Sequence, residues 1–247
     1  MIRTIGIEKA TLYDKYRLPY APEAAEDLLA HVGQAPVVAD IGAGTGQLAR
    51  LFAGQSAKVY AVEPDPAMRE VASASLQGGA VVEIVAGLAE QTGLAGNSVD
   101  LVVVGNAFHR FRPEACEELR RILKKSGWIA LFTYHFLNET FTDMLFSRLA
   151  TLPGLAGRIE RAWPRTPLQE LFGTGRIHTR RYRQSHAEDW TAFFGAACAG
   201  IEAPESHDFE FAQFEAINHQ VFDAFTVNGR IQIEYGTEVA FGQPLVD

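Results

Sequence analysis

Residues 37–46 read VVADIGAGTG, a short apolar run followed by three glycines at alternate positions. The apolar run is typical of a strand that is buried on both faces of a parallel sheet. Glycines suit the turn because they reach dihedral angles that a Cβ forbids, and because they let a ligand approach the backbone closely. A helix with Leu48, Leu51 and Phe52 on one face is expected next. This order of strand, glycine turn and helix predicts a ligand site at the carboxyl end of the strand.

Two acidic residues flank this unit and narrow the choice of ligand. Glu63 ends a second predicted strand at 58–62, about twenty residues on, where a carboxylate can bind both ribose hydroxyls of a nucleoside. A dinucleotide turn would place its third glycine at position 47, where Gln47 stands instead. Asp40 would repel a pyrophosphate but suits the ammonium of a methionine moiety, so the pattern favours S-adenosylmethionine over NAD.

The segments on either side continue the alternation of helix and strand. Pro22, Pro66 and Pro113 each open a predicted helix, the last of which carries Lys124 and Lys125 at its end and closes at Gly127. Further strands are predicted at 81–86, 99–104 and 128–134. Strands separated by helices in this rhythm indicate parallel pairing with right-handed crossovers.

After residue 135 the pattern changes. A helix over 141–149 precedes a proline- and glycine-rich stretch to 175 that looks like an insertion. A sixth strand is expected at 177–183, followed by a capping box at 185–188 that opens a helix, and by another helix over 214–225. The segment 231–241 alternates apolar and polar residues strictly, as a half-buried antiparallel strand near a sheet edge does.

These elements predict an α/β fold: a doubly wound, Rossmann-like, mostly parallel seven-stranded sheet with an antiparallel last strand and a helical insertion or lid. We expect a single domain over 1–247. Its parts are an N-terminal flap and helix (1–35), a cofactor-binding core (36–135), the lid (136–175), and C-terminal strands and helices (176–247).

Composition and charge restrict the partners. The chain is 47% hydrophobic and carries a formal net charge of -8, which would repel a nucleic-acid backbone. No apolar run is long enough for a bilayer, and the N-terminus lacks a signal-peptide core, so a cytoplasmic, unanchored monomer or homodimer is expected. The histidines have no ligand-spaced partners, which argues against a metal. Two groups of side chains are interpreted as structural and not as functional. We expect Cys116 and Cys198 to be buried as small apolar residues. We expect Arg176, Arg180, Arg181 and Arg183 to form a solvated face of a strand.

Asp40, the glycines up to Gly46, Glu63 and three further segments together resemble the class I S-adenosylmethionine-dependent methyltransferases of the small-molecule type 11 kind. Residues 16–20 (YRLPY) look like the Tyr-Arg-Pro-x-Tyr element that precedes the first helix in many members. Residues 83–90 look like the segment that borders the adenine. Residues 118–127 resemble the helix and turn before the fifth strand, with Lys-Lys-Ser-Gly in place of the usual Lys-Pro-Gly-Gly.

The resemblance implies which residues surround the cofactor. Many members have Asp where Leu88 stands, to accept a hydrogen bond from the adenine amino group, so here we expect adenine to be held mainly by apolar packing. The implied cofactor-binding residues are Tyr16, Arg17, Asp40, Gly42, Ala43, Gly44, Gly46, Gln47, Glu63, Pro64, Met68, Gly87, Leu88, Ala89, Asn106, Ala107 and His109.

Residues 105–111 (GNAFHRF) resemble the segment that lies beneath the methionine part of the cofactor, in its Ala-x-His-aromatic form. They do not match the Asn-Pro-Pro-Tyr form that methylates bases of nucleic acids. The implied reaction is in-line methyl transfer to a small-molecule acceptor, with S-adenosylhomocysteine as product. His109 is the candidate general base, and packing beside the cofactor is the alternative explanation of it.

Two other functions stay open from the sequence. A non-catalytic module that binds S-adenosylmethionine would have the same fold, and Leu88 together with the absence of a compelling base is consistent with it. An NAD-dependent oxidoreductase is disfavoured by Gln47.

Overall fold

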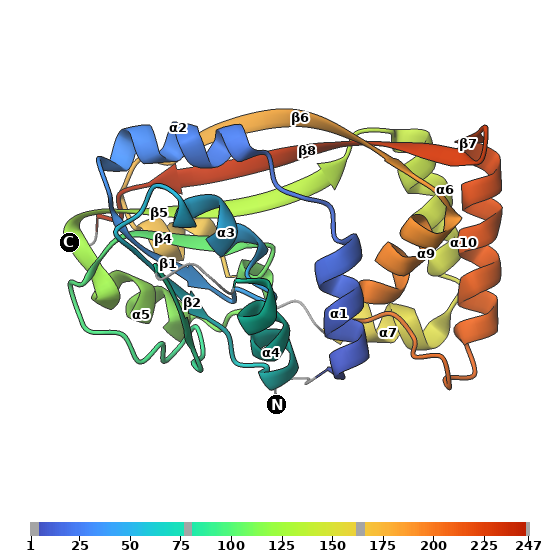
Figure 1. The fold of residues 1–247 in the computed structure, drawn as a ribbon, viewed down its shortest axis with the longest axis horizontal. Helices are drawn as coiled ribbons and strands as arrows, with labels where there is room; N and C mark the ends of the chain where they lie inside the picture. Colours follow the sequence, from blue (N-terminus) through green and yellow to red (C-terminus); the bar gives the residue numbers. More distant parts are fainter. Residues whose placement is uncertain (1–4, 77–80, 162–165, 246–247) are drawn as a thin grey trace.

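The structure is a computed structural model that describes residues 5–76, 81–161 and 166–245. Within these ranges a single β-sheet runs through the whole molecule (Figure 1). Its main hydrogen-bonded path runs in the order β3 (Val82–Val85), β2 (Lys58–Val62), β1 (Val37–Ile41), β4 (Val99–Gly105), β5 (Leu123–Phe136), β8 (Arg230–Gly242) and β6 (His178–Glu188). An eighth, two-residue strand, β7 (Thr226–Val227), pairs with the start of β8.

The strand directions confirm the predicted doubly wound sheet. The first five strands of the path, from β3 to β5, are parallel to their neighbours. Strand β8 is antiparallel to both β5 and β6, so it lies one strand in from the edge that β6 forms. The seven predicted strands are all present, and β7 is an addition that the sequence pattern did not predict.

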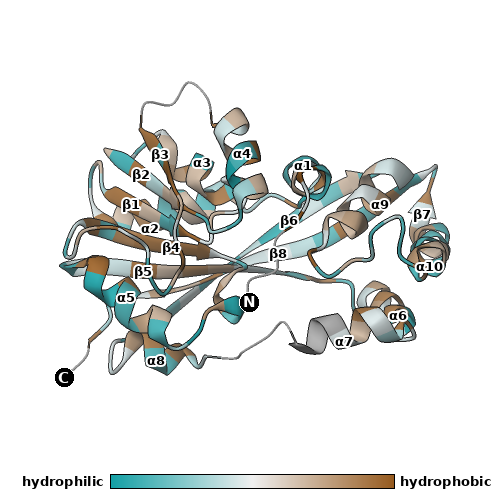
Figure 2. Ribbon diagram, turned by 90° about the horizontal axis from the view of Figure 1, so that it is seen from below, coloured by the Kyte–Doolittle hydropathy of each residue, from teal (hydrophilic) through white to brown (hydrophobic). Residues whose placement is uncertain are grey.

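Helices cover both faces of the parallel part, as the strand alternation requires. Leu101 and Val103 point to a core beneath α2 (Pro22–Val32) and α3 (Gln47–Ala53), and α4 (Pro66–Ser75) lies on this side too. Val102 and Val104 point to the opposite core, beneath α5 (Glu114–Ile122) and α8 (Leu168–Phe172). Figure 2 shows these two layers of helices on either side of the strands.

A second group of helices packs on the far ends of β5, β6 and β8, at the right of Figure 1. It consists of α6 (Glu139–Leu149), α7 (Pro153–Arg161), α9 (Trp190–Ala199) and α10 (Phe211–Phe225). Phe141, Phe193 and Phe222 form its aromatic core against Ile231, Ile233 and Tyr235 of β8. Among the described residues no helix is long and apolar enough to cross a lipid bilayer.

The predicted insertion is helical, but its role as a lid stays a prediction. Helix α6 packs against α10, while α8 packs against α5 beneath the sheet. Residues 162–165, between α7 and α8, lie outside the described residues.

Helix α1 (Ile7–Tyr16) bridges the two groups of helices, since it packs against α4 on one side and α9 on the other. The buried Lys9 joins α1 to the segment after α9, because its Nζ donates to Ala203 O at 2.8 Å and lies 3.2 Å from Glu205 Oε1. Helix α1 thereby joins the two groups of helices, and the role of residues 1–35 as a flap stays a prediction.

The predicted end of the helix after Pro113 is wrong. Helix α5 ends at Ile122, and Lys124, Lys125 and Gly127 already belong to β5. The loop before β4 supplies the donors that a glycine cap would have provided, because the N–H of Ser98 donates to Ile122 O at 2.8 Å. Lys124 Nζ instead contacts both carboxylate oxygens of Asp100 on the neighbouring strand, each at 2.9 Å.

The predicted capping box at 185–188 is also wrong, because these residues extend β6 by pairing with β8. The Ser185 hydroxyl donates across the strands to Glu234 Oε1 at 2.8 Å. The N-cap of α9 is Asp189, whose Oδ1 accepts from the N–H of Ala192 at 2.9 Å. Tertiary pairing with β8 therefore overrides the local helix signal.

The two capping assignments can be separated by substitution. Asp189→Ala is expected to lower the free energy of unfolding by about 1 kcal/mol, because it leaves a helix N–H without its acceptor. Ser185→Ala, at an exposed cross-strand site, should change it by less than about 0.5 kcal/mol. Urea denaturation measures both, and the reverse ranking would restore the capping box.

Candidate functional site

The glycine turn between β1 and α3 has the backbone that its sequence predicts. Gly42, Gly44 and Gly46 all have positive φ, at 71°, 57° and 79°. A Cβ on Gly42 would lie 2.8 Å from the Cβ of Ala107, and one on Gly46 would lie 2.6 Å from Leu76. Two of these glycines are therefore required by close packing as well as by conformation.

Glu63 holds the turn in place. Its Oε2 accepts from the N–H of Gly44 at 2.8 Å, and its Oε1 accepts from the N–H of Asp65 at 2.9 Å. The side chain is buried, and this burial raises the pKa of Glu63 above its ordinary value. Each carboxylate oxygen keeps a further acceptor site, so Glu63 can accept hydroxyl donors of a ligand without releasing the backbone.

Asp40 lies at the other end of the unit with one oxygen unpartnered. Its Oδ2 accepts from the N–H of Ala49 at 3.0 Å, which ties β1 to α3. Its Oδ1 is buried without a hydrogen-bond partner among the described residues. Burial raises the pKa of Asp40 to about 7. Such an orphaned acceptor is costly unless a ligand or solvent donor reaches it.

The turn after β2 places Pro64 and Met68 beside Glu63. Asp65 Oδ1 caps α4 by accepting from the N–H groups of Ala67 and Met68, at 2.9 and 3.0 Å. Arg69 Nη1 donates to the carbonyls of Glu63 and Pro64, at 2.9 and 2.7 Å. The turn is thus fixed from both sides, and Met68 is buried next to it.

The segment predicted to border the adenine lies beside the end of β2. A Cβ on Gly87 would come within 3.0 Å of the Val62 side chain. Leu88 and Gln91 form an isolated backbone bridge, and Ala89 is buried in the core beneath β1 and β4. Leu88 offers no side-chain acceptor here, in keeping with the sequence-based expectation.

The N-terminal flap contributes Arg17 to the same region. Gln47 Nε2 donates to Arg17 O at 3.3 Å, so the flap is hydrogen-bonded to the start of α3. The Arg17 guanidinium lies between two rings, 5.0 Å from the Tyr13 centroid and 4.7 Å from that of Tyr134. Its Nε is buried without a hydrogen-bond partner within the described ranges.

The two neighbouring tyrosines of α1 have different surroundings. Tyr16 packs against α9, where a Cβ on Gly195 would lie 2.5 Å from its ring. Tyr13 instead faces the glycine turn, with its ring 4.0 Å from the Cβ position of Gly44. The sequence predicts Tyr16 as a cofactor-binding residue and does not predict Tyr13. Tyr13 lies four residues before Arg17, and this helical spacing could have indicated that the two side chains lie on the same side of the helix.

The segment after β4 joins the glycine turn to the rest of the site. Asn106 has a positive φ of 48°, and its Nδ2 donates to the Tyr20 hydroxyl at 2.9 Å. Ala107 contacts the glycine turn, as its distance from the Gly42 Cβ position shows. His109 lies in the 3-10 helix η1 (Phe108–Arg110). Burial, helped by the nearby Arg110 charge, lowers the pKa of His109 to about 4, so the ring is neutral at pH 7.

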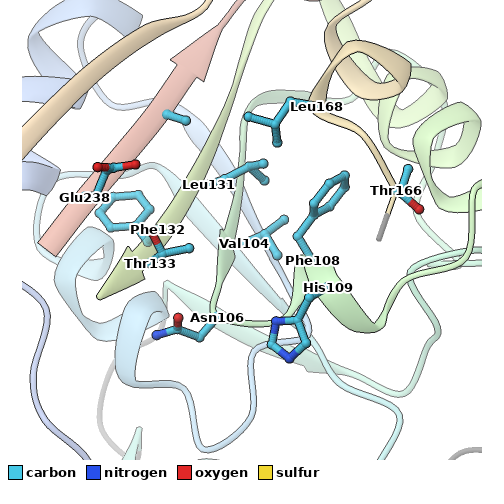
Figure 3. Close-up of a pocket in the computed structure, with 11 residues that line it drawn as sticks. Val104, Asn106, Phe108, His109, Leu131, Phe132, Thr133, Thr166, Leu168 and Glu238 are labelled. Atoms are coloured by element: carbon cyan, nitrogen blue, oxygen red, sulfur yellow. The ribbon is translucent and has the colours of Figure 1, made fainter. Parts of the chain in front are cut away.

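A cavity of about 250 Å³ opens beside this segment (Figure 3). Asn106 and His109 lie at one end of it and Leu168 at the other, with Glu238 and Thr166 on opposite walls. Its lining residues are Val104, Asn106, Phe108, His109, Leu131, Phe132, Thr133, Thr166, Leu168, Glu238 and Ala240. Of these, the sequence-based set contains Asn106 and His109 alone.

Comparison with known proteins agrees with this geometry. Residues 39–131 match the family model of a methyltransferase domain. The chain is 37% identical over 120 residues to an uncharacterized methyltransferase of Mycobacterium tuberculosis, an alignment that covers 48% of this chain and 47% of that one. An uncharacterized methyltransferase of Schizosaccharomyces pombe is 33% identical over 123 residues, with 48% of each chain covered. The chain thus matches about half the length of these curated relatives.

Solved structures support the fold over a longer stretch. The YcgJ protein of Bacillus subtilis has a TM-score of 0.58 at 19% identity, with 92% of this chain and 100% of that chain covered. A protein of Anaeromyxobacter dehalogenans provisionally assigned as a type II methyltransferase has a TM-score of 0.60 at 19% identity, with coverages of 92% and 97%. At this identity the similarity concerns the fold.

The sheet order and strand directions of this chain are those of a doubly wound, Rossmann-like α/β fold, which it shares with these solved structures. Residues 39–131, which match the model of a methyltransferase domain, include both the glycine turn and Glu63.

The raised pKa of Asp40 makes a prediction about stability. Between the ordinary value of 3.8 and about 7 the folded state binds more protons at this group than the unfolded state does. The free energy of unfolding should therefore fall as pH rises through this window, by at most about 1.4 kcal/mol per pH unit from this group. Urea denaturation of Asp40→Asn should show a smaller fall than the parent protein, whereas parallel pH profiles would contradict it.

Proposed function

We propose that this protein is a methyltransferase that transfers a methyl group from S-adenosylmethionine to a small-molecule acceptor. The observation that carries the proposal is the position of Glu63, which binds the glycine turn and keeps acceptor sites at the end of β2. The matched domain and the fold support a methyltransferase, and the identity of the acceptor is part of the proposal.

The residues of the site fit the cofactor chemically. Glu63 would accept hydrogen bonds from the ribose hydroxyls, and the glycine turn, which has no side chain at Gly44, would let the amino-acid tail approach the backbone closely. The unpartnered Oδ1 of Asp40 suits the ammonium of that tail, directly or through water. Met68 and the 87–89 segment would pack against the adenine. These contacts involve most of the residues predicted from the sequence to bind the cofactor, and Arg17 of the N-terminal segment, hydrogen-bonded to Gln47 of α3, would close the site.

Bound S-adenosylmethionine supplies a methyl group on a sulfur that is already an activated leaving group. The chain then has mainly to align the acceptor with it and to exclude water. The 106–109 segment performs this alignment, because Ala107 contacts the glycine turn while Asn106 and His109 line the cavity. Neutral His109 can accept a hydrogen bond or a proton from an acceptor, although a pKa of about 4 makes it a weak base.

The acidic net charge favours a small molecule over a nucleic acid as acceptor. Within the described ranges no group of histidine, cysteine or acidic side chains is placed to hold a metal ion. Because the methyl group of bound S-adenosylmethionine is on an already activated leaving group, we propose a reaction carried by alignment and desolvation.

The test of the proposal is calorimetric titration of S-adenosylhomocysteine into the protein and two variants. Glu63→Ala removes both backbone contacts and the sugar acceptors, and is expected to raise Kd at least about tenfold, or roughly 1.4 kcal/mol. Glu63→Gln retains one acceptor oxygen and should be affected less.

Glu117→Ala is the matched control, since Glu117 is an exposed carboxylate on α5, away from the glycine turn. Its affinity should equal that of the parent protein. An unchanged Kd for Glu63→Ala, in protein whose circular dichroism and unfolding temperature show it to be folded, would mean that the site is elsewhere. Tight binding without methyl transfer to any acceptor tested would favour the non-catalytic module.

A further inference from the structure

We infer that the cavity beside Asn106 and His109 is the acceptor pocket, and that it selects a compact, neutral, largely apolar molecule with a hydrogen-bond donor directed at Glu238. This inference rests on the proposed function and adds the chemical class of the acceptor to it.

The position of the cavity follows from the 106–109 segment, which borders both the cavity and the glycine turn. Ala107 contacts Gly42 of the turn. The residues on either side of it, Asn106 and Phe108, line the cavity together with His109 (Figure 3). A methyl donor bound at the turn would therefore lie next to the cavity, with the 106–109 segment at their common edge.

The walls determine the bulk of the acceptor. Val104, Leu131 and Ala240 come from three adjacent strands, and Phe108 and Leu168 face them from η1 and α8. These side chains are all apolar, so the body of the ligand gains by leaving water. A volume of about 250 Å³ lies just below the range of roughly 300–1,000 Å³ that is usual for small-molecule pockets, which indicates a compact acceptor.

The polar groups determine its charge. Among the described residues that line the cavity, Glu238 carries the formal charge at neutral pH. These residues include no lysine or arginine, and His109 is neutral at that pH. Arg181 lies across the strands from Glu238 and donates through Nε to Oε2 at 2.5 Å, but it is 72% exposed and does not line the cavity. An anionic ligand would lose its hydration beside a carboxylate and meet no cation among the described lining residues, which is unfavourable.

A neutral ligand with a hydrogen-bond donor would instead be favoured beside Glu238. The structure gives the Oε1 of Glu238 no hydrogen-bond partner among the described residues, and Thr133 faces Glu238 in the strand register. A hydroxyl or N–H group on the ligand can therefore bond to this carboxylate. Hydrogen bonds to a charged partner are stronger than neutral ones, so this contact would orient the acceptor.

Two naphthalene probes of different charge test the selection, 2-naphthol as a neutral donor and 2-naphthoate as an anion. Each is titrated into the protein saturated with S-adenosylhomocysteine, and binding is followed by calorimetry or by saturation-transfer NMR. We expect 2-naphthol to bind about tenfold or more tightly than 2-naphthoate. Ala240→Leu, which fills part of the cavity, should weaken 2-naphthol and leave the S-adenosylhomocysteine Kd unchanged.

Glu238→Gln is expected to reduce the preference for 2-naphthol over 2-naphthoate, because it removes the charge and introduces a donor. Glu234→Gln is the matched control: Glu234 lies four residues away on the same face of β8, accepts from Ser185 and does not line the cavity. Its preference should match that of the parent protein.

The outcomes separate the two proposals. If S-adenosylhomocysteine does not bind, the proposed function fails and the inference fails with it. If it binds but 2-naphthoate binds more tightly, or if Glu238→Gln leaves the preference unchanged, the inference alone is overturned.

Discussion

The carboxylate of Glu63 is the interaction on which the site depends. It joins the end of β2 to the glycine turn after β1 through Gly44, and to the start of α4 through Asp65. A buried carboxylate that accepts two backbone N–H groups fixes the relative position of the two loops that follow the paired strands β1 and β2. Gly42 is required in the turn because Ala107 approaches it from the end of β4. Three strand ends thereby form one rigid edge of the sheet, where a ligand can be held without reorganising the backbone.

The cavity depends on a different constraint, the length of β5, β8 and β6. These strands run beyond the parallel core and carry the second group of helices at their far ends. One face of β8 is buried throughout, while the opposite face carries Glu238 and Ala240 beside the end of β4. Arg110 Nη2 donates to both carboxylate oxygens of Glu202, each at 3.0 Å, and so connects η1 to the segment after α9. The two ends of the molecule are thus joined next to His109, which lines the cavity.

The cofactor half of the site could be predicted from sequence because its determinants are local. The glycines, Asp40 and Glu63 each stand at the end of a strand whose apolar pattern is clear, and parallel strands bring those ends together. The cavity could not be predicted, because Glu238 lines it together with Leu131 and His109 only as a result of β8 lying between β5 and β6 in the sheet. Helix α1 was not predicted for a related reason. Its buried Lys9 donates a hydrogen bond to the carbonyl of Ala203, 194 residues away, and the local sequence gives no indication of this contact. Where local signals and tertiary pairing disagreed, as at Ser185 and Gly127, the pairing prevailed.

The alternation of β8 has an evolutionary consequence. A single inserted or deleted residue within this strand would exchange its faces, exposing Tyr235 and Val239 and burying Glu238. The hairpin that precedes the strand is under no such restriction: Asn228 and Gly229 form its turn with positive φ, away from both cores. Length changes among descendants of this chain should therefore accumulate at the hairpin tip, while diversity of acceptors arises by point replacement along the open face of the strand.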